Sequence, residues 1–166
     1  EAGNTDSMRA VLACYPESQR RQAACAQGLN ETCALHWAAS SCNPEAVKLI
    51  LHLYPEAQHL QIMMNAKDEF GRTILHYAAY SGSSIEGILL LLPESHRLQM
   101  LKMKSVDEET ALHIAAESGN PESVKAILNV YPESQRLQAV CTPVDYGMTV
   151  LHCAIESEHT ITAILE

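Results

Sequence analysis

The most constraining feature of this 166-residue chain is a unit that returns along its length. The segments "LHWAA", "LHYAA", "LHIAA" and "LHCAI" place His36, His76, His113 and His152 at matching positions, separated by 40, 37 and 39 residues. A second series, "YPESQR", "YPEAQH", "LPESHR" and again "YPESQR", places its prolines 39, 38 and 39 residues apart. A period of this length indicates an array of stacked supersecondary units.

Each unit is predicted to begin with two helices joined by a tight turn. In "TILHYAAY", Leu75, Ala78 and Ala79 have the i, i+3, i+4 spacing of one helical face, and their small side chains allow close helix approach. A second helix is predicted to start at Pro121, because Asn120 is a favoured N-cap and proline is favoured at the first helical position. The glycine before this pair is typical of a helix end. The same Asn-Pro-Glu sequence occurs at Asn43 and predicts the same start there.

The proline series predicts a third, short helix in every unit. Proline disfavours helix in the residue before it, so it ends the second helix. The same proline, such as Pro132, is expected at the first position of the next helix. Pairs of apolar residues follow three of these prolines and are expected to pack against the core: Leu60 and Met63, Leu98 and Leu101, Leu137 and Val140. Arg21 and Ala24 replace such a pair in the first copy, which predicts a more exposed segment there.

The segment "NAKDEFGRTILHYAAYSG", residues 65–82, closely resembles the ankyrin repeat. The resemblance implies an all-α helical solenoid of ankyrin type, here with an extra short helix in each repeat. Ankyrin units are about 33 residues long, whereas these are longer and carry the "YPESQR" segment after the second helix. Glu31 and Glu108 stand where the family has its turn glycine, which Gly71 and Gly147 retain. This difference leaves the shape of the protruding turns open.

We interpret residues 1–166 as a single array of about four repeats with partial units at both ends, and we expect it to be a segment of a larger protein. The style of the repeats also resembles ankyrin arrays in effector proteins that intracellular bacteria deliver into host cells. The expected location is the cytoplasm. The alternative is the host-cell cytosol after secretion by a bacterium.

Charge and composition exclude several classes of function. The net charge is −9, and no cluster of Lys or Arg opposes it, so we expect no nucleic-acid partner and no anionic membrane partner. The longest apolar run is too short to cross a bilayer. The six cysteines form no C-x-x-C pair and are expected to be free buried thiols in a reducing compartment.

The residues that most often carry chemistry are explained by the repeat. Equivalent histidines lie about one helix spacing apart, roughly 10 Å, which is too far for neighbouring copies to share a metal ion. In ankyrin repeats this histidine resembles a structural residue that hydrogen-bonds to adjacent backbone. The chain has no G-x-S-x-G motif and no glycine-rich phosphate loop. We therefore expect no enzymatic activity, no catalytic residues, no metal and no cofactor.

Candidate binding residues are the positions that differ between units in the turn and the first helix, which line the concave face in ankyrin proteins. Aromatic residues and arginine among them are frequent interface anchors, and the acidic members favour a basic partner surface. The partner-binding set comprises Trp37, Ser40, Glu69, Phe70, Arg72, Tyr77, Tyr80, Asp107, Glu109, Glu117, Asp145, Tyr146, Met148 and Glu156. For Trp37 and Tyr77, filling the layer between helices is an equal alternative.

The predicted function is a protein–protein interaction module that acts as a monomer and binds a protein partner on its concave face. Two alternatives remain open. In the first alternative, the array is a regulatory or targeting segment of a larger enzyme, or of a secreted bacterial effector, whose catalytic domain lies outside this chain. In the second, it is a structural spacer with no dedicated partner.

Overall fold

The computed structural model describes residues 2–41, 43–81 and 85–155. Regular secondary structure in these ranges is helical, apart from one isolated β-bridge between Lys67 and Thr73. The α-helices are α1 (Ala2–Ala13), α2 (Glu17–Cys25), α3 (Ala34–Ser40), α4 (Pro44–Leu51), α5 (Glu56–Asn65), α6 (Ile74–Tyr80), α7 (Glu86–Leu89), α8 (Glu94–Leu101), α9 (Ala111–Glu117), α10 (Pro121–Val130), α11 (Glu133–Cys141) and α12 (Val150–Ile155). Two short 3-10 helices are η1 (Leu29–Glu31) and η2 (Asp145–Gly147).

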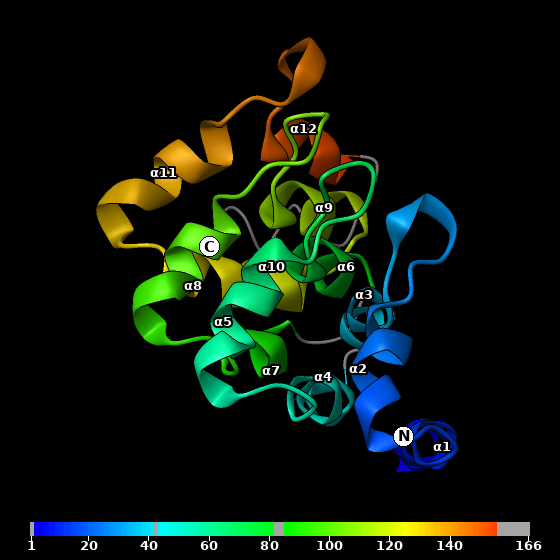
Figure 1. Cartoon of the computed structure of the whole chain (residues 1–166). Helices are drawn as coiled ribbons and strands as arrows, with labels where there is room; N and C mark the ends of the chain where they lie inside the picture. The colour runs from blue at the N-terminus through cyan, green and yellow to red at the C-terminus, as the bar shows by residue number, and fades with distance from the viewer. Residues whose placement is uncertain (1, 42, 82–84, 156–166) are drawn as a thin grey trace.

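The helices fall into three sets that repeat in order along the chain. The inner helices α3, α6, α9 and α12 each contact the next inner helix. The outer helices α1, α4, α7 and α10 stack in the same way, and α4 and α10 also pack on the inner helix of their own unit. The joint helices α2, α5, α8 and α11 follow the outer helices. Figure 1 shows this stack rising from the blue N-terminal helices to the red α12, which confirms the predicted helical solenoid with an extra helix per repeat.

Local sequence signals set the helix starts. Asn43 Oδ1 accepts hydrogen bonds from the backbone N–H groups of Glu45 and Ala46, at 3.0 and 3.3 Å, and Pro44 occupies the first turn of α4. Asn120 caps α10 in the same manner by accepting from the Ser123 N–H. These side chains satisfy backbone donors that have no partner inside the helix. The caps match the sequence prediction for both outer helices.

The joint prolines lie one residue earlier than predicted. Pro132 is the N-cap of α11, with ψ at 141°, and the three equivalent prolines have ψ between 137° and 146°. These are extended values, so each proline precedes its helix and the following glutamate takes the first helical position. The proline still ends the outer helix, and its missing N–H is not needed at this position.

The last residue of the "YPESQR" hexapeptide closes the outer helix before it. Arg136 Nε donates to the carbonyls of Leu128 and Tyr131 at 3.1 and 3.3 Å. Arg20 binds two such carbonyls near the end of α1, Arg97 binds one after α7, and a ring nitrogen of His59 lies 3.0 Å from the Tyr54 carbonyl. The last carbonyls of a helix have no internal partner. The hexapeptide therefore caps one helix while it starts the next.

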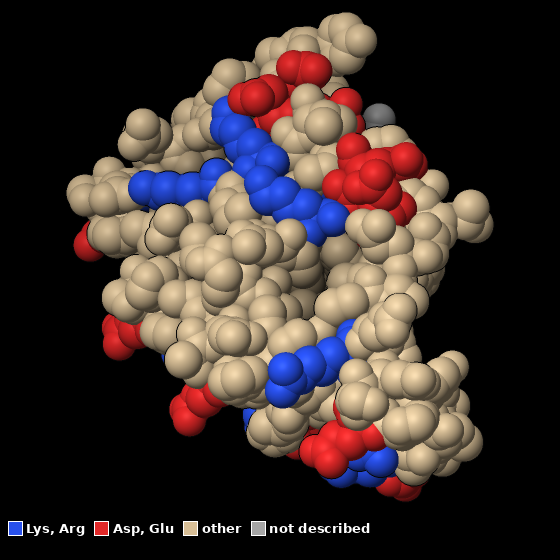
Figure 2. Space-filling view, in the orientation of Figure 1, with Lys and Arg blue, Asp and Glu red and all other residues tan. Residues whose placement is uncertain are grey.

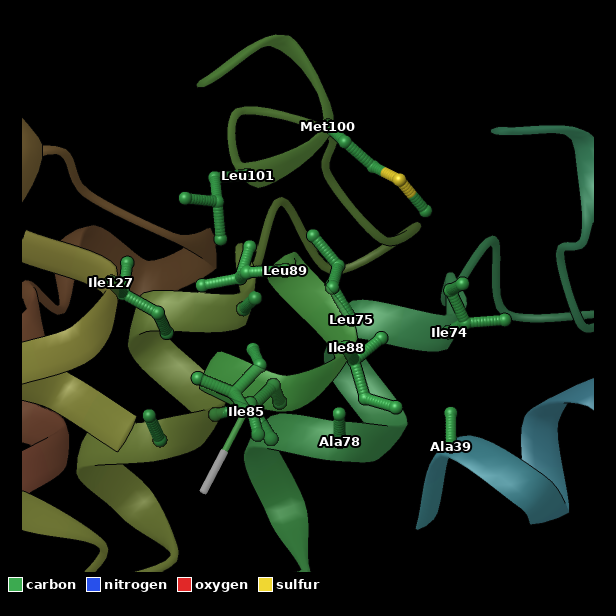
Figure 3. Packing of buried hydrophobic residues seen from close by; sticks show 14 of the residues in the cluster. Ala39, Ile74, Leu75, Ala78, Ile85, Ile88, Leu89, Met100, Leu101 and Ile127 are labelled. Carbon is green, nitrogen blue, oxygen red and sulfur yellow. The ribbon is translucent and has the colours of Figure 1, made fainter. Parts of the chain in front are cut away.

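The core runs continuously through the units. Leu75 of α6 and Ile88 of α7 are fully buried, and each such side chain contributes roughly 1.5–3 kcal/mol through its removal from water. Figure 3 shows Leu101 of joint helix α8 pointing toward Leu89, so the joint helix closes the core on its side. A close approach between units depends on Gly87, where an added Cβ would lie 2.5 Å from the ring of Pro44.

Two expectations about the joint helices were wrong. Leu137 is 75% exposed, although its equivalents Leu60 and Leu98 are partly buried against the core. Ala24 is buried although its segment was expected to be exposed, while Arg21 in the same helix is exposed. Arg21 places its guanidinium 5.7 Å from the centre of the Tyr54 ring. The long side chain of Arg21 thus contacts Tyr54 of the next unit while it stays exposed to solvent.

The four turns before the inner helices share one closing hydrogen bond, and the first and fourth also contain a second left-handed residue, Asn30 and Tyr146. In each, a backbone N–H donates to the carbonyl four residues later, in the pairs Gly28–Thr32, Asp68–Arg72, Ser105–Glu109 and Val144–Met148. Neighbouring turns are also joined by backbone hydrogen bonds, from Glu69 to Asn30, Val106 to Phe70 and Asp145 to Asp107, at 3.0, 2.8 and 3.4 Å. We call these three bonds the turn ladder. They hold successive turns in register.

The turn shape survives the replacement of glycine by glutamate. Gly71 and Gly147 have φ of 71° and 76°, and Glu31 and Glu108 adopt the same left-handed region at 57° and 62°. A left-handed conformation costs a residue with a Cβ roughly 1–2 kcal/mol. The closing hydrogen bond and the ladder therefore impose this conformation on both glutamates.

Candidate functional site

A hollow of about 290 Å³ lies on the inner-helix side of the stack. We call it the inner hollow. Side chains from α3, α6 and α9 and from the second turn line it: Trp37, Ser40, Arg72, His76, Tyr77, Tyr80, Ile114 and Glu117. Six of these eight residues belong to the predicted partner-binding set.

The repeat places equivalent side chains of successive inner helices around the hollow. Trp37, Tyr77 and Ile114 each follow the histidine of an inner helix, and successive inner helices contact one another, so equivalent side chains line one hollow. Trp37 is 63% exposed and Tyr80 is 71% exposed. These aromatic surfaces are available to a partner and are not used in the core.

The rings of the hollow are held in place by specific contacts. Trp37 Nε1 donates to Thr32 Oγ1 at 3.3 Å, and the Trp37 ring lies edge-on to the Tyr77 ring at 6.5 Å between centres. The Tyr77 hydroxyl donates to Asp68 Oδ2 at 2.9 Å. Burial, followed by this contact with Asp68, raises the pKa of Tyr77 to about 12. Tyr77 is therefore a neutral hydrogen-bond donor at neutral pH.

Asp68 connects the hollow to the second turn. Its buried carboxylate accepts from the backbone N–H groups of Phe70 and Arg72, at 3.0 and 2.8 Å, as well as from Tyr77. Ser105 makes the same pair of backbone contacts in the third turn, to Asp107 and Glu109 at 3.2 Å each. The two central turns are thus fixed by a side chain as well as by their backbone.

Arg72 is held between two neighbours. Its guanidinium carbon lies 5.4 Å from the centre of the Phe70 ring, and its Nη2 is 3.9 Å from Glu109 Oε2. Arg72 Nε is buried and has no hydrogen-bond partner within the described ranges. The long ion pair with Glu109 contributes little by itself, because Arg72 is partly exposed.

Carboxylates are crowded at the C-terminal side of the hollow. Burial, and next the nearby Glu117, raise the pKa of Glu109, with a smaller contribution from Asp107. Arg72 opposes this rise without cancelling it. The negative charge of Glu109 and Glu117 is therefore incompletely compensated in the hollow.

The repeated histidines have the structural role expected of them. His76 Nδ1 accepts from the Thr73 N–H at 3.0 Å, and its Nε2 lies 3.1 Å from the Glu109 carbonyl of the next unit. Burial is the first cause that lowers the pKa of His76 to about 4, so it is neutral. His113 repeats the pattern with the Thr142 carbonyl at 2.9 Å. His36 Nε2 faces the carbonyls of Arg72 and Ala66 without reaching regular hydrogen-bond geometry to either.

In the described part of the chain, no group of three or more His, Cys, Asp or Glu side chains converges on a common point. Across the described ranges, no helix combines the length and apolar character needed to span a bilayer.

The remaining predicted residues lie along the turns. Glu109 adjoins the hollow through Arg72, and Phe70 supports Arg72 from the other side. Tyr146 is fully exposed at the tip of the fourth turn, with φ at 66°. Four others are exposed at the turns without entering the hollow, namely Glu69, Asp107, Asp145 and Met148. Glu156 lies outside the described residues.

Sequence reasoning missed Asp68, Ile114 and His76 as parts of the site. The position after the repeated histidine changes from Trp37 to Tyr77 to Ile114, and this variation would have identified Ile114. Asp68 carries the family aspartate of the quoted motif, but its hydrogen bond to a side chain nine residues later is visible only in three dimensions.

A family model described as ankyrin repeats (three copies) matches residues 1–100 and again residues 96–166.

Proposed function

Because this chain belongs to the ankyrin-repeat family, we propose that it binds a protein partner across its inner helices and turn tips. Ankyrin repeats are in general protein–protein interaction modules. The observation that carries the proposal is the inner hollow, where Trp37 and Tyr80 present large exposed rings on three packed helices. Aromatic residues on a rigid support are typical anchors of protein interfaces.

The fixed positions of the side chains that line the hollow also support binding at this surface. Asp68 fixes Tyr77, and Thr32 fixes Trp37, before any partner arrives. Side chains that are already ordered lose little conformational entropy on binding. The turn ladder extends this ordered surface to the exposed tips of the neighbouring turns.

The proposed partner surface is basic. On the face in Figure 2, acidic side chains gather in the upper part, around the C-terminal half of the stack, beside a band of basic ones. Asp107, Glu109, Glu117 and Asp145 lie on the turns and the end of α9, and the whole chain has a net charge of −9. Complementary charge steers association and suppresses acidic partners.

A cross-linking pull-down from the source cells tests the proposal. The triple variant Phe70→Ala, Arg72→Ala, Tyr80→Ala should lose the proteins that the parent chain captures, by at least about tenfold, because anchors of this kind cost 2 kcal/mol or more when removed. Circular dichroism should show that the variant retains its helix content.

A matched triple on the joint helices is the control. Gln58→Ala, Gln99→Ala and Leu137→Ala change exposed residues on α5, α8 and α11 and should leave capture unchanged. If the inner-face triple captures the same proteins as the parent chain, or if the joint triple loses them, the proposed surface is wrong.

A further inference from the structure

We propose that the inner hollow receives one cationic side chain, lysine or arginine, from the partner, with the charge between the rings of Trp37 and Tyr80 and the carboxylate of Glu117. This inference rests on the proposed function and names the chemistry that the hollow selects. All three residues line the same space of about 290 Å³.

The aromatic side of the hollow suits a cation. Trp37 and Tyr80 are mostly exposed, and the Trp37 ring is anchored by Thr32 and lies edge-on to Tyr77. A cation near the face of tryptophan or tyrosine is attracted by the ring quadrupole, with tryptophan the strongest of the aromatic side chains. Ile114 adds an apolar wall for the methylene stem of the same side chain.

The charge balance points to the same ligand. Arg72 is the cationic residue in the lining of the hollow, and its Nε is buried beside the Phe70 ring while its Nη2 lies 3.9 Å from Glu109. Glu117 is exposed at the end of α9, and His76 is buried and neutral. Glu117 is therefore the carboxylate in the lining, and the guanidinium of Arg72 in the same lining is directed toward Glu109 beside the hollow.

Other side chains fit this hollow less well. An apolar side chain would contact the rings but would remove water from Glu117 without replacing it, which is unfavourable for a charged group. An acidic side chain would be repelled by this carboxylate. A cationic side chain would contact the rings of Trp37 and Tyr80 and would also neutralise the nearby carboxylate of Glu117.

Tryptophan fluorescence reads this hollow directly, because Trp37 is the single tryptophan of the chain. The probes are four blocked tripeptides, acetyl-Gly-X-Gly-amide, with X as lysine, arginine, norleucine or glutamate. Lysine and arginine should change the Trp37 emission saturably at low salt, and comparing them shows which cation is preferred. Norleucine should bind at least about tenfold more weakly and glutamate should not bind, since a tenfold difference is 1.4 kcal/mol.

Charge variants provide the controls. Glu117→Gln should weaken lysine and arginine binding about five- to tenfold, while Glu122→Gln, which removes an exposed charge from α10, should not. The inference is overturned if norleucine binds as well as lysine, or if Glu117→Gln leaves the lysine affinity unchanged. If the inner-face triple loses partner capture while the cationic probes do not bind, the interface stands and the cation pocket fails.

Discussion

His76 illustrates how one side chain can serve three purposes at once. It closes the start of its own helix through Thr73, binds the backbone of the next unit at the Glu109 carbonyl, and lines the inner hollow. The two hydrogen bonds require the neutral imidazole, with Nδ1 as acceptor and Nε2 as donor. Burial holds the pKa of His76 near 4, below the usual 6.5.

This burial predicts that acid destabilises the fold through His76. Above pH 6.5 the imidazole is neutral in both states, so it adds no pH dependence. Between pH 6.5 and about 4 the unfolded chain takes up a proton that the folded protein resists, so the free energy of unfolding falls as pH falls, by up to about 1.4 kcal/mol per pH unit. Urea denaturation from pH 7 to pH 4.5 measures the slope.

Two glutamine variants isolate the contribution of His76. His76→Gln does not titrate and should show a shallower decline than the parent chain, even though it is less stable at pH 7. His52→Gln, at an exposed position after α4, should keep the slope of the parent chain. Equal slopes for all three proteins would contradict the prediction.

Among the elements, the joint helices are distinguished by how they begin. Each begins directly after a proline in extended conformation, and the hexapeptide supplies the side chain that caps the preceding helix. The outer and joint helices therefore share one short segment, in which Arg136 caps the end of α10 while α11 starts without a side-chain cap.

Removal of one cap should lower stability measurably. Arg136→Met keeps the length of the side chain but leaves the carbonyls of Leu128 and Tyr131 without their donor. We expect a loss of about 1 kcal/mol in the free energy of unfolding, modest because Arg136 is exposed. Arg9→Met, an exposed arginine on α1, is the control for loss of charge and should change stability less. Equal effects of the two substitutions would rule out the cap.

The sequence predicted the individual helices better than the contacts between them. The caps at Asn43 and Asn120 and the inner-helix stripes are local patterns, so the helices they set were predicted correctly. The hydrogen bond from Arg136 to Leu128 spans eight residues, and that from Tyr77 to Asp68 spans nine. Contacts of this kind depend on how the chain folds back on itself, and the recurrence of a basic residue at the end of each hexapeptide does not specify its partner.

The site shows the same division. The variable positions predicted Trp37 and Tyr80 as members of a shared surface, and both line the inner hollow. The partial burial of Phe70 was not predictable, because the contact between its ring and the Arg72 guanidinium depends on the folded turn.

For the whole molecule, the turn ladder predicts unusual protection in hydrogen exchange. The amides of Glu69 and Val106 donate to the preceding turn, although both side chains are exposed at the turn tips. They should exchange at least about tenfold more slowly than the amide of Tyr146, which has no hydrogen-bond acceptor in the described part of the chain. Exchange measured by NMR compares the three sites, and similar rates would show that the turns move independently.

The common geometry of the turns also determines where the chain tolerates changes in length. The residue that opens each turn and the histidine of the following helix are always eight apart, from Gly28 and His36 to Val144 and His152. From each histidine to the next turn the distance varies, at 32, 29 and 31 residues. Differences in length between units thus fall between the repeated histidine and the next turn, a stretch that contains the outer and joint helices. The proposed recognition surface keeps a constant spacing from turn to inner helix, and the rest of each unit varies in length.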